Sequence, residues 1–163
     1  MATPDFVLAL RDRVGTAPLW LSGVTAVVLR DDETLLVRRA DNGEWTPVTG
    51  IIDPGEEPAD AAVRECAEEA DVVVEPLRLA LVGVTHEVVY ANGDQAQYLD
   101  HTFVMRWISG EPAPADGENT EARWFPLDGL PPMAEHMTAR LEAARQPGTG
   151  AAFGFAGRMV RPV

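Results

Sequence analysis

The chain has 163 residues, 46% of them hydrophobic and 24% charged, a composition typical of one folded domain spanning residues 1–163 rather than of a disordered segment. Its formal net charge of −13 disfavours binding to DNA or RNA polymers, but it leaves small phosphorylated molecules open, because a bound cation can reverse the local field. All 13 basic residues are arginine, which excludes chemistry through a Schiff-base lysine and phosphate binding by a Walker-type loop.

The first half of the chain predicts one helix, several short strands and a second helix. Apolar residues at helical spacing indicate an amphipathic helix over Pro4–Val14, and the β-branched run Gly23–Leu29 is typical of a buried strand. A returning strand at Leu35–Arg39 and a short extended segment at Trp45–Gly50 follow. Pro58–Ala70 is the clearest helix, because it has a proline in its first turn and alanines through its middle.

The second half predicts mostly strands. Two long strands, Leu77–Tyr90 and Tyr98–Ser109, are followed by a loop rich in proline, glycine and acidic residues, Gly110–Asn119. A short strand at Ala122–Phe125 and a helix at Met133–Arg145 complete the pattern. Strands interleaved with helices predict an α/β domain with a mixed sheet.

The C-terminal tail, residues 147–163, has no clear periodicity. It contains Phe153, Phe155 and Met159 but is too short to form a core of its own. We therefore expect the tail to pack on the domain or across a homodimer.

The cellular location is predicted from three features. No apolar run is long enough to cross a bilayer, and the first residues, Met1–Asp5, lack the basic start and apolar stretch of a signal peptide. The single cysteine, Cys66, excludes an internal disulfide. We expect a cytoplasmic protein that acts away from membranes.

Three glutamates carry the strongest chemical signal. Glu65, Glu68 and Glu69 stand at positions i, i+3 and i+4 of the predicted helix, so their carboxylates share one face and repel one another. A hard divalent cation among them would relieve that repulsion, because Mg²⁺ prefers oxygen ligands. Taken alone, however, three such residues more often form a solvated helix surface.

The wider spacing favours the metal site. Gly50 is followed after five residues by Glu56, and after seven more by the Arg64–Glu65 pair and then by Glu68–Glu69. This spacing resembles the Nudix box of the MutT-like hydrolases, which here spans 23 positions from Gly50 to Val72. The resemblance extends in general layout over Leu19–Arg145 and implies the Nudix fold, an α/β/α sandwich around a mixed β-sheet.

Two box positions depart from the family pattern. Cys66 takes the place of a bulky aliphatic residue, and a buried cysteine can fill it as a small hydrophobic side chain. Asp71 takes the place of the glycine just after the helix, where a left-handed backbone conformation is expected and strains aspartate.

The resemblance assigns roles to the box residues. It implies a Mg²⁺ site, with Mn²⁺ as a substitute, whose ligands are the carboxylates of Glu65, Glu68 and Glu69 and the backbone carbonyl of Gly50. It also implies a salt bridge between Glu56 and Arg64 that pins the loop to the helix. The implied reaction is attack of water on phosphorus in the pyrophosphate bond of a nucleoside diphosphate linked to another moiety. Phosphoryl transfer needs positioning and charge neutralisation more than covalent catalysis, which such a site supplies.

The catalytic base varies within this family. In the box the natural candidate is Glu65, whereas the remote candidates are Glu118 and Glu121 near the predicted strand at 122–125. We prefer Glu118, because it lies deeper in the flexible loop and could approach the site when substrate binds. Both remote residues are also consistent with plain surface acids.

Substrate contacts are predicted at four residues outside the box. Arg38 and Arg39 end a strand before the box and could bind phosphate oxygens, while Trp45 and Tyr98 could stack on a base. Aromatic residues in strands are nonetheless usually part of the core, and one arginine could simply be solvated. A binding module of the same fold that senses a nucleotide without cutting it is the alternative function. The sequence leaves open oxidised dNTPs, ADP-ribose, dinucleoside polyphosphates and nucleotide sugars as substrates.

Overall fold

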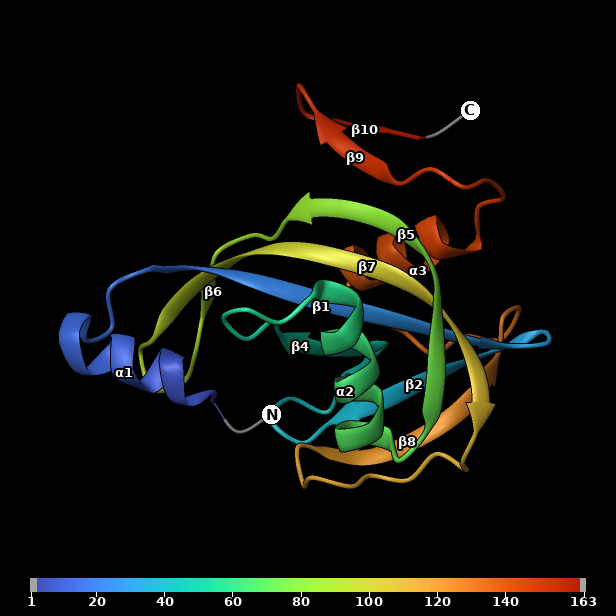
Figure 1. Ribbon diagram of the computed structural model, residues 1–163, viewed down its shortest axis with the longest axis horizontal. Coiled ribbons are helices and arrows are strands. Elements are labelled where there is room, and N and C mark those ends of the chain that lie inside the picture. The colour runs from blue at the N-terminus through green and yellow to red at the C-terminus, as the bar shows by residue number, and fades with distance from the viewer. Residues whose placement is uncertain (1–2, 162–163) are drawn as a thin grey trace.

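The apolar run around Val24–Val28 lies at the centre of a ten-stranded mixed sheet in the computed structural model, which describes residues 3–161 (Figure 1). The helices are α1 (Asp5–Val14), α2 (Pro58–Ala70) and α3 (Glu135–Arg145). The strands are β1 (Leu19–Arg30), β2 (Glu33–Arg39), β3 (Trp45–Thr46), β4 (Val48–Ile51), β5 (Val73–Val84), β6 (Val88–Val89), β7 (Gln95–Ser109), β8 (Asn119–Pro126), β9 (Ala152–Phe155) and β10 (Arg158–Val160).

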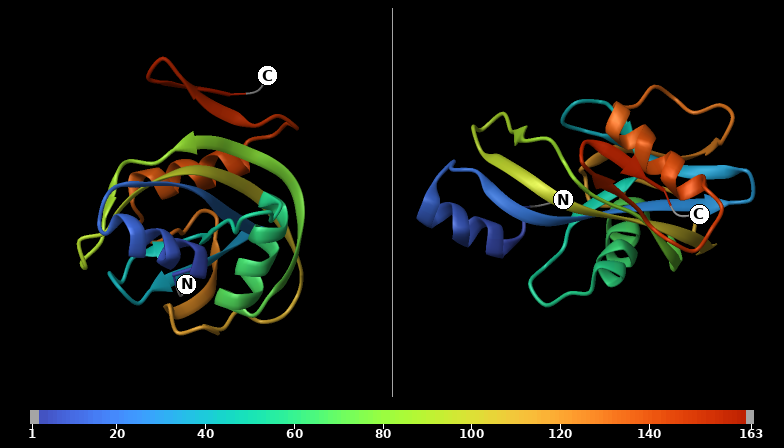
Figure 2. Two further views of the ribbon diagram at one scale, coloured as in Figure 1. Left: turned by 60° about the vertical axis from the view of Figure 1, so that its left-hand side comes forward. Right: turned by 90° about the horizontal axis from the view of Figure 1, so that it is seen from above.

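The sheet is mixed because β1 and β7 run parallel while most other neighbours are antiparallel. Its main order is β10-β9-β5-β7-β1-β2-β3, with β4 paired to β1, β6 to β7 and β8 to β2. The β1–β7 pairing runs from Leu19 opposite Ala96 to Leu29 opposite Arg106. Figure 2 shows α2 on one face of the sheet and α3 on the other. The predicted α/β/α sandwich with a mixed sheet is therefore confirmed.

Each face of the sheet has its own core. On the α2 side, Val24, Val37 and Met105 pack with Cys66, which is fully buried and fills space as expected of a small hydrophobic residue. On the α3 side, Val27 and Leu36 pack against the helix. A third cluster joins α1 to the sheet beside Tyr98. Alternation of side chains along β1 divides its residues between the two cores.

Two segments of the second half differ from what the sequence predicts. The strand expected at Leu77–Tyr90 begins earlier, at Val73, and β5 ends at Val84; the chain then loops through residues 85–87 before β6. The tail also forms strands, because β9 adds to the open edge of β5 through Leu81 opposite Ala152. This pairing is set by a distant strand edge and leaves no periodic pattern in so short a segment.

The tail packs on the domain, but not through the residues expected to anchor it. Ala152 is buried, whereas Phe153, Phe155 and Met159 remain exposed. An exposed aromatic hairpin is consistent with a homodimer, which stays a prediction. Among the described residues, no helix combines the length and apolar character needed to span a membrane.

Asp71 ends α2 in the left-handed conformation predicted for it, with φ 55° and ψ 38°. Its backbone N–H donates to the Ala67 carbonyl oxygen and the N–H of Val72 donates to that of Cys66, as in a helix cap, and the Asp71 side chain is exposed. Asp71→Gly should therefore relieve strain and raise the free energy of unfolding by about 0.5–1 kcal/mol at most, because glycine also loosens the unfolded chain. Urea unfolding measures this change. A less stable variant would show that the aspartate side chain makes a favourable contact.

Candidate active site

The helix α2 has the predicted bounds and brings the three box glutamates next to the sheet. Glu65 and Glu69 point into the protein and are only 1% and 5% exposed, whereas the Glu68 side chain is 53% exposed. The helix therefore presents two buried carboxylates and one at the rim. Burying carboxylates is costly unless they are hydrogen-bonded or neutralised, so their partners decide what the site can do.

Arg64 ties the helix to the preceding loop. Its Nε and Nη2 donate to the two carboxylate oxygens of Glu56 at 2.8 and 2.9 Å, and its Nη2 also donates to the Ile51 carbonyl oxygen at 3.2 Å. Its Nη1 donates to Glu65 at 2.8 Å and to Glu68 at 3.2 Å. The hydrogen bonds from Arg64 lower the pKa of Glu56. Because a bidentate guanidinium–carboxylate pair is geometrically specific, Arg64 fixes both the loop and the direction of Glu65.

Gly50 makes room for Glu65. Residue 50 lies on β4, opposite Val24 of β1, and a Cβ atom added to it would stand 2.1 Å from the Glu65 carboxylate. Any side chain at this position would push the carboxylate away from the strand. The glycine thus lets Glu65 lie directly against the β4 backbone.

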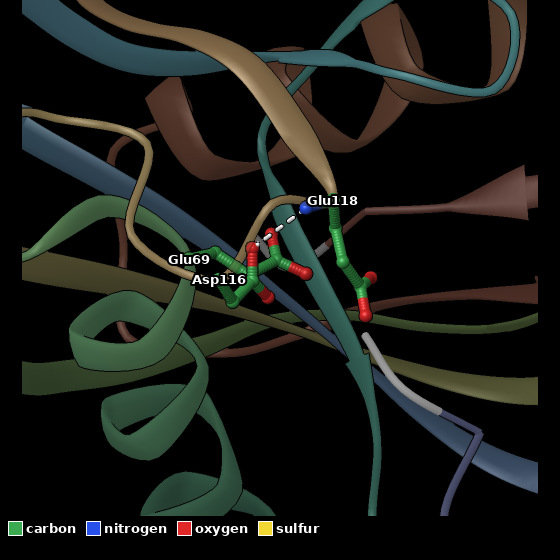
Figure 3. Close-up of side chains that lie close together, drawn as sticks. All are labelled: Glu69, Asp116 and Glu118. Atoms are coloured by element: carbon green, nitrogen blue, oxygen red, sulfur yellow. Dashed lines mark hydrogen bonds between the residues drawn. The ribbon is translucent and has the colours of Figure 1, made fainter.

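A second group of carboxylates meets Glu69. Oxygen atoms of Glu69, Asp116 and Glu118 lie within 4.8 Å of one another, with Glu69 on α2 and the other two on the loop before β8 (Figure 3). The Asn119 Nδ2 donates to Glu69 at 3.2 Å, and the Glu118 N–H donates to Asp116 at 3.0 Å. Sequence reasoning named Glu118 but missed Asp116 and Asn119. The only feature of the sequence that could have indicated these two residues is their position in the same acidic loop as Glu118.

Burial of these carboxylates suits a cation site. Burial raises the pKa of Glu65 to about 8 and that of Glu69 to about 7, which means that negative charge there is poorly compensated. The atoms available as metal ligands are carboxylate and carbonyl oxygens, which Mg²⁺ and Mn²⁺ prefer. The residues present therefore fit a hard divalent cation.

The raised pKa values predict a pH effect on the metal-free chain. Between about pH 4.5 and 8, folded Glu65 holds more protons than unfolded Glu65, so its contribution to the free energy of unfolding is fully present below this window and falls as pH rises through it. Glu65→Gln mimics the protonated carboxyl and should remove this component. We expect melting temperatures measured with chelator to diverge in favour of the variant as pH rises to 8. A constant difference between the two proteins would contradict the prediction.

The two consecutive arginines at the end of β2 have different partners. Arg38 donates to Glu121 at 2.9 Å, and Arg39 donates to Asp41 at 2.9 and 2.6 Å. Glu121 also pairs with Arg123 at 3.3 Å, so this glutamate is held by two arginines rather than in the carboxylate group around Glu69.

The two aromatic candidates lie in different surroundings. Trp45 packs edge-on against Phe125 on the α3 side of the sheet and borders a hollow of about 340 Å³ shared with Met133. Tyr98 packs over Gly23, and its hydroxyl is 2.6 Å from that of Tyr90. Trp45 therefore has open space beside its ring, whereas the Tyr98 hydroxyl already has a hydrogen-bond partner.

Comparisons with known proteins agree with this geometry. The family model described as the NUDIX domain matches residues 20–144. The chain is 30% identical over 128 residues to the NAD-capped RNA hydrolase NudC of Pseudomonas syringae pv. syringae, covering 75% of this chain and 42% of that protein. It is 31% identical over 126 residues to an 8-oxo-dGDP phosphatase of Mus musculus, covering 72% of this chain and 36% of that protein. The chain thus spans less than half the length of these curated relatives.

Solved structures share the fold. A crystal structure of an ADP-ribose pyrophosphatase from Streptococcus suis is 25% identical, with a TM-score of 0.64, covering 82% of this chain and 98% of that one. The whole of that enzyme therefore corresponds to one domain of the kind seen here. The similarity extends well beyond the 23 positions of the box.

Proposed function

This chain belongs to the Nudix hydrolase family, and on that premise we propose that it uses Mg²⁺, or Mn²⁺ in its place, to hydrolyse the pyrophosphate bond of a small nucleoside diphosphate derivative. One observation carries the proposal: two almost fully buried glutamates, Glu65 and Glu69, converge on a strand glycine and an acidic loop. A binding module has no need to keep buried carboxylates with raised pKa values. Glu65, Glu68, Glu69 and the Gly50 carbonyl would hold the cation, and Asp116 lies close enough to Glu69 to assist.

The side chains around this site have separable roles in the proposed mechanism. A divalent cation there would neutralise charge on the diphosphate and lower the pKa of a bound water. Arg64 and Glu56 keep Glu65 in place, and Glu118 accepts the proton of the attacking water. As the oxygen–phosphorus bond forms, the bond to the bridging oxygen breaks and the phosphate-bearing group leaves. Arg39 would donate to phosphate oxygens.

The nucleoside end of the substrate is proposed to lie by one of two rings in different surroundings: Trp45, beside the hollow it shares with Met133, or Tyr98. A base can stack on such a ring without a sequence-specific hydrogen bond. The net charge of −13 supports a small molecule over capped RNA, even though the Pseudomonas syringae relative is named as a hydrolase of NAD-capped RNA.

A substrate panel tests the proposal. The metal-free chain is incubated with ADP-ribose, NAD, an oxidised deoxynucleoside di- or triphosphate, a nucleotide sugar and an NAD-capped RNA oligonucleotide, with and without Mg²⁺. We expect release of phosphate or a nucleoside monophosphate from a small substrate, abolished by chelator. No turnover of any compound with Mg²⁺ or Mn²⁺ would reject the activity. Turnover confined to the RNA would reject the small-molecule assignment.

A further inference from the structure

Arg38 and Arg39 are directed to opposite faces of the sheet. The β2–β8 pairing shifts register between them, so that Arg38 lies opposite Glu121 while Arg39 lies opposite Asn119. Directly opposed residues of antiparallel strands share a face, and irregular pairing of this kind is often found where a side chain is redirected next to a functional site. Since the Asn119 side chain donates to Glu69, Arg39 lies on the face that carries the buried carboxylates.

Arg39 therefore stands beside a concentration of negative charge. The N–H of the next residue, Ala40, donates to the Glu118 carbonyl oxygen at 2.8 Å, which fixes the end of β2 against the acidic loop. The hydrogen bond to Asp41 is the main cause that raises the pKa of Arg39, and the negative charge of Glu69 raises it further. A guanidinium on a flexible stem could fold onto these carboxylates and take the place of a cation.

Asp41 holds Arg39 in its observed direction. The Arg39 Nε donates to one oxygen of Asp41 at 2.9 Å, and its Nη2 donates to the other at 2.6 Å. A tight turn supports the pair. The backbone N–H of Arg39 donates to the carbonyl oxygen of Glu44, and the N–H of Gly43, at φ +73°, donates to the carbonyl oxygen of Arg39. Asp41 thus occupies one edge of the guanidinium, and the remaining donors lie on the opposite edge.

We propose that Asp41 is a positioning residue that keeps Arg39 from occupying the metal carboxylates and leaves the free edge of its guanidinium for a phosphate oxygen of the substrate. The inference rests on the proposed metal site, and it adds a residue outside the box to the control of that site. Loss of Asp41 would release Arg39 toward Glu69 and its neighbours. The cation and the arginine would then compete for the same oxygens.

The test measures metal binding by calorimetric titration of the metal-free full chain with MnCl₂. Asp41→Asn should weaken Mn²⁺ binding by about tenfold, a usual size for coupling between contacting groups. Arg39→Gln should leave binding as tight as in the wild type or tighter. In the double variant Asp41→Asn with Arg39→Gln, affinity should return to that of Arg39→Gln, because the competing guanidinium is gone. Both single variants should raise KM.

Matched variants separate positioning from structure. Asp41→Glu, which keeps the carboxylate, should restore most of the affinity. Glu33→Gln removes the carboxylate from another strand-end pair, Arg30–Glu33 at 2.8 Å, and should change neither Mn²⁺ binding nor KM. Unchanged affinity in Asp41→Asn, or a double variant as weak as Asp41→Asn, would overturn the inference. A wild-type chain that binds no Mn²⁺ would instead reject the proposed metal site.

Discussion

Replacing Glu69 by glutamine is expected to lower kcat at least about a hundredfold, because stabilisation of charge by a bound metal contributes several kcal/mol to catalysis. Glu69 is the carboxylate at which the helix and the acidic loop meet, so its loss affects both groups of ligands. An amide is nearly the same size and is neutral. The variant should therefore fold, and its metal-free form should be at least as stable as the wild type near pH 8.

The control for this experiment comes from the same motif. Glu57 precedes α2, is exposed and makes no side-chain capping hydrogen bond, so Glu57→Gln should keep wild-type kinetics. Rates are measured over a range of Mg²⁺ concentrations, so that weak binding is distinguished from lost chemistry. Near wild-type turnover of Glu69→Gln at saturating Mg²⁺ would remove Glu69 from the site.

Glu118→Gln is expected to lower kcat by about 10²–10⁴-fold, the usual contribution of general base catalysis, with a smaller effect on metal affinity. The structure places the Glu118 carboxylate beside those of Glu69 and Asp116, whereas Glu121 is paired with Arg38 and Arg123. We therefore expect Glu121→Gln to lose less than tenfold. The pair of variants is matched in chemistry and differs only in which carboxylate is removed.

The outcome also distinguishes a base from a ligand. If Glu118→Gln weakens Mn²⁺ binding as strongly as Glu69→Gln does, Glu118 acts with Asp116 as a ligand and not as the base. If neither Glu118→Gln nor Glu121→Gln loses tenfold while Glu65→Gln is inactive, the base belongs to the box helix.

Local sequence determined the parts of the protein that depend on residues close together in the chain. The helix Pro58–Ala70 was predicted to the residue, because its proline start and alanine content act locally. The left-handed Asp71 followed from its place in the box. The three glutamates at i, i+3 and i+4 were identified in the same way, since the period of a helix fixes which residues share a face. Membership of the family followed from the box spacing and is confirmed.

Tertiary structure decided which carboxylates are buried and what surrounds them. Glu65 is buried because β4 brings a glycine against it, and Asp116 reaches Glu69 only because the loop before β8 folds back over α2. The same holds for the partners of Arg38 and Arg39: alternation along a strand puts the two side chains on opposite faces, but only the pairing with β8, whose register shifts at this point, brings Glu121 opposite Arg38 and Asn119 opposite Arg39. Contacts of this kind depend on which strands meet and in what register. A local pattern of residues does not specify the partner strands or their register, because these depend on how the whole sheet assembles.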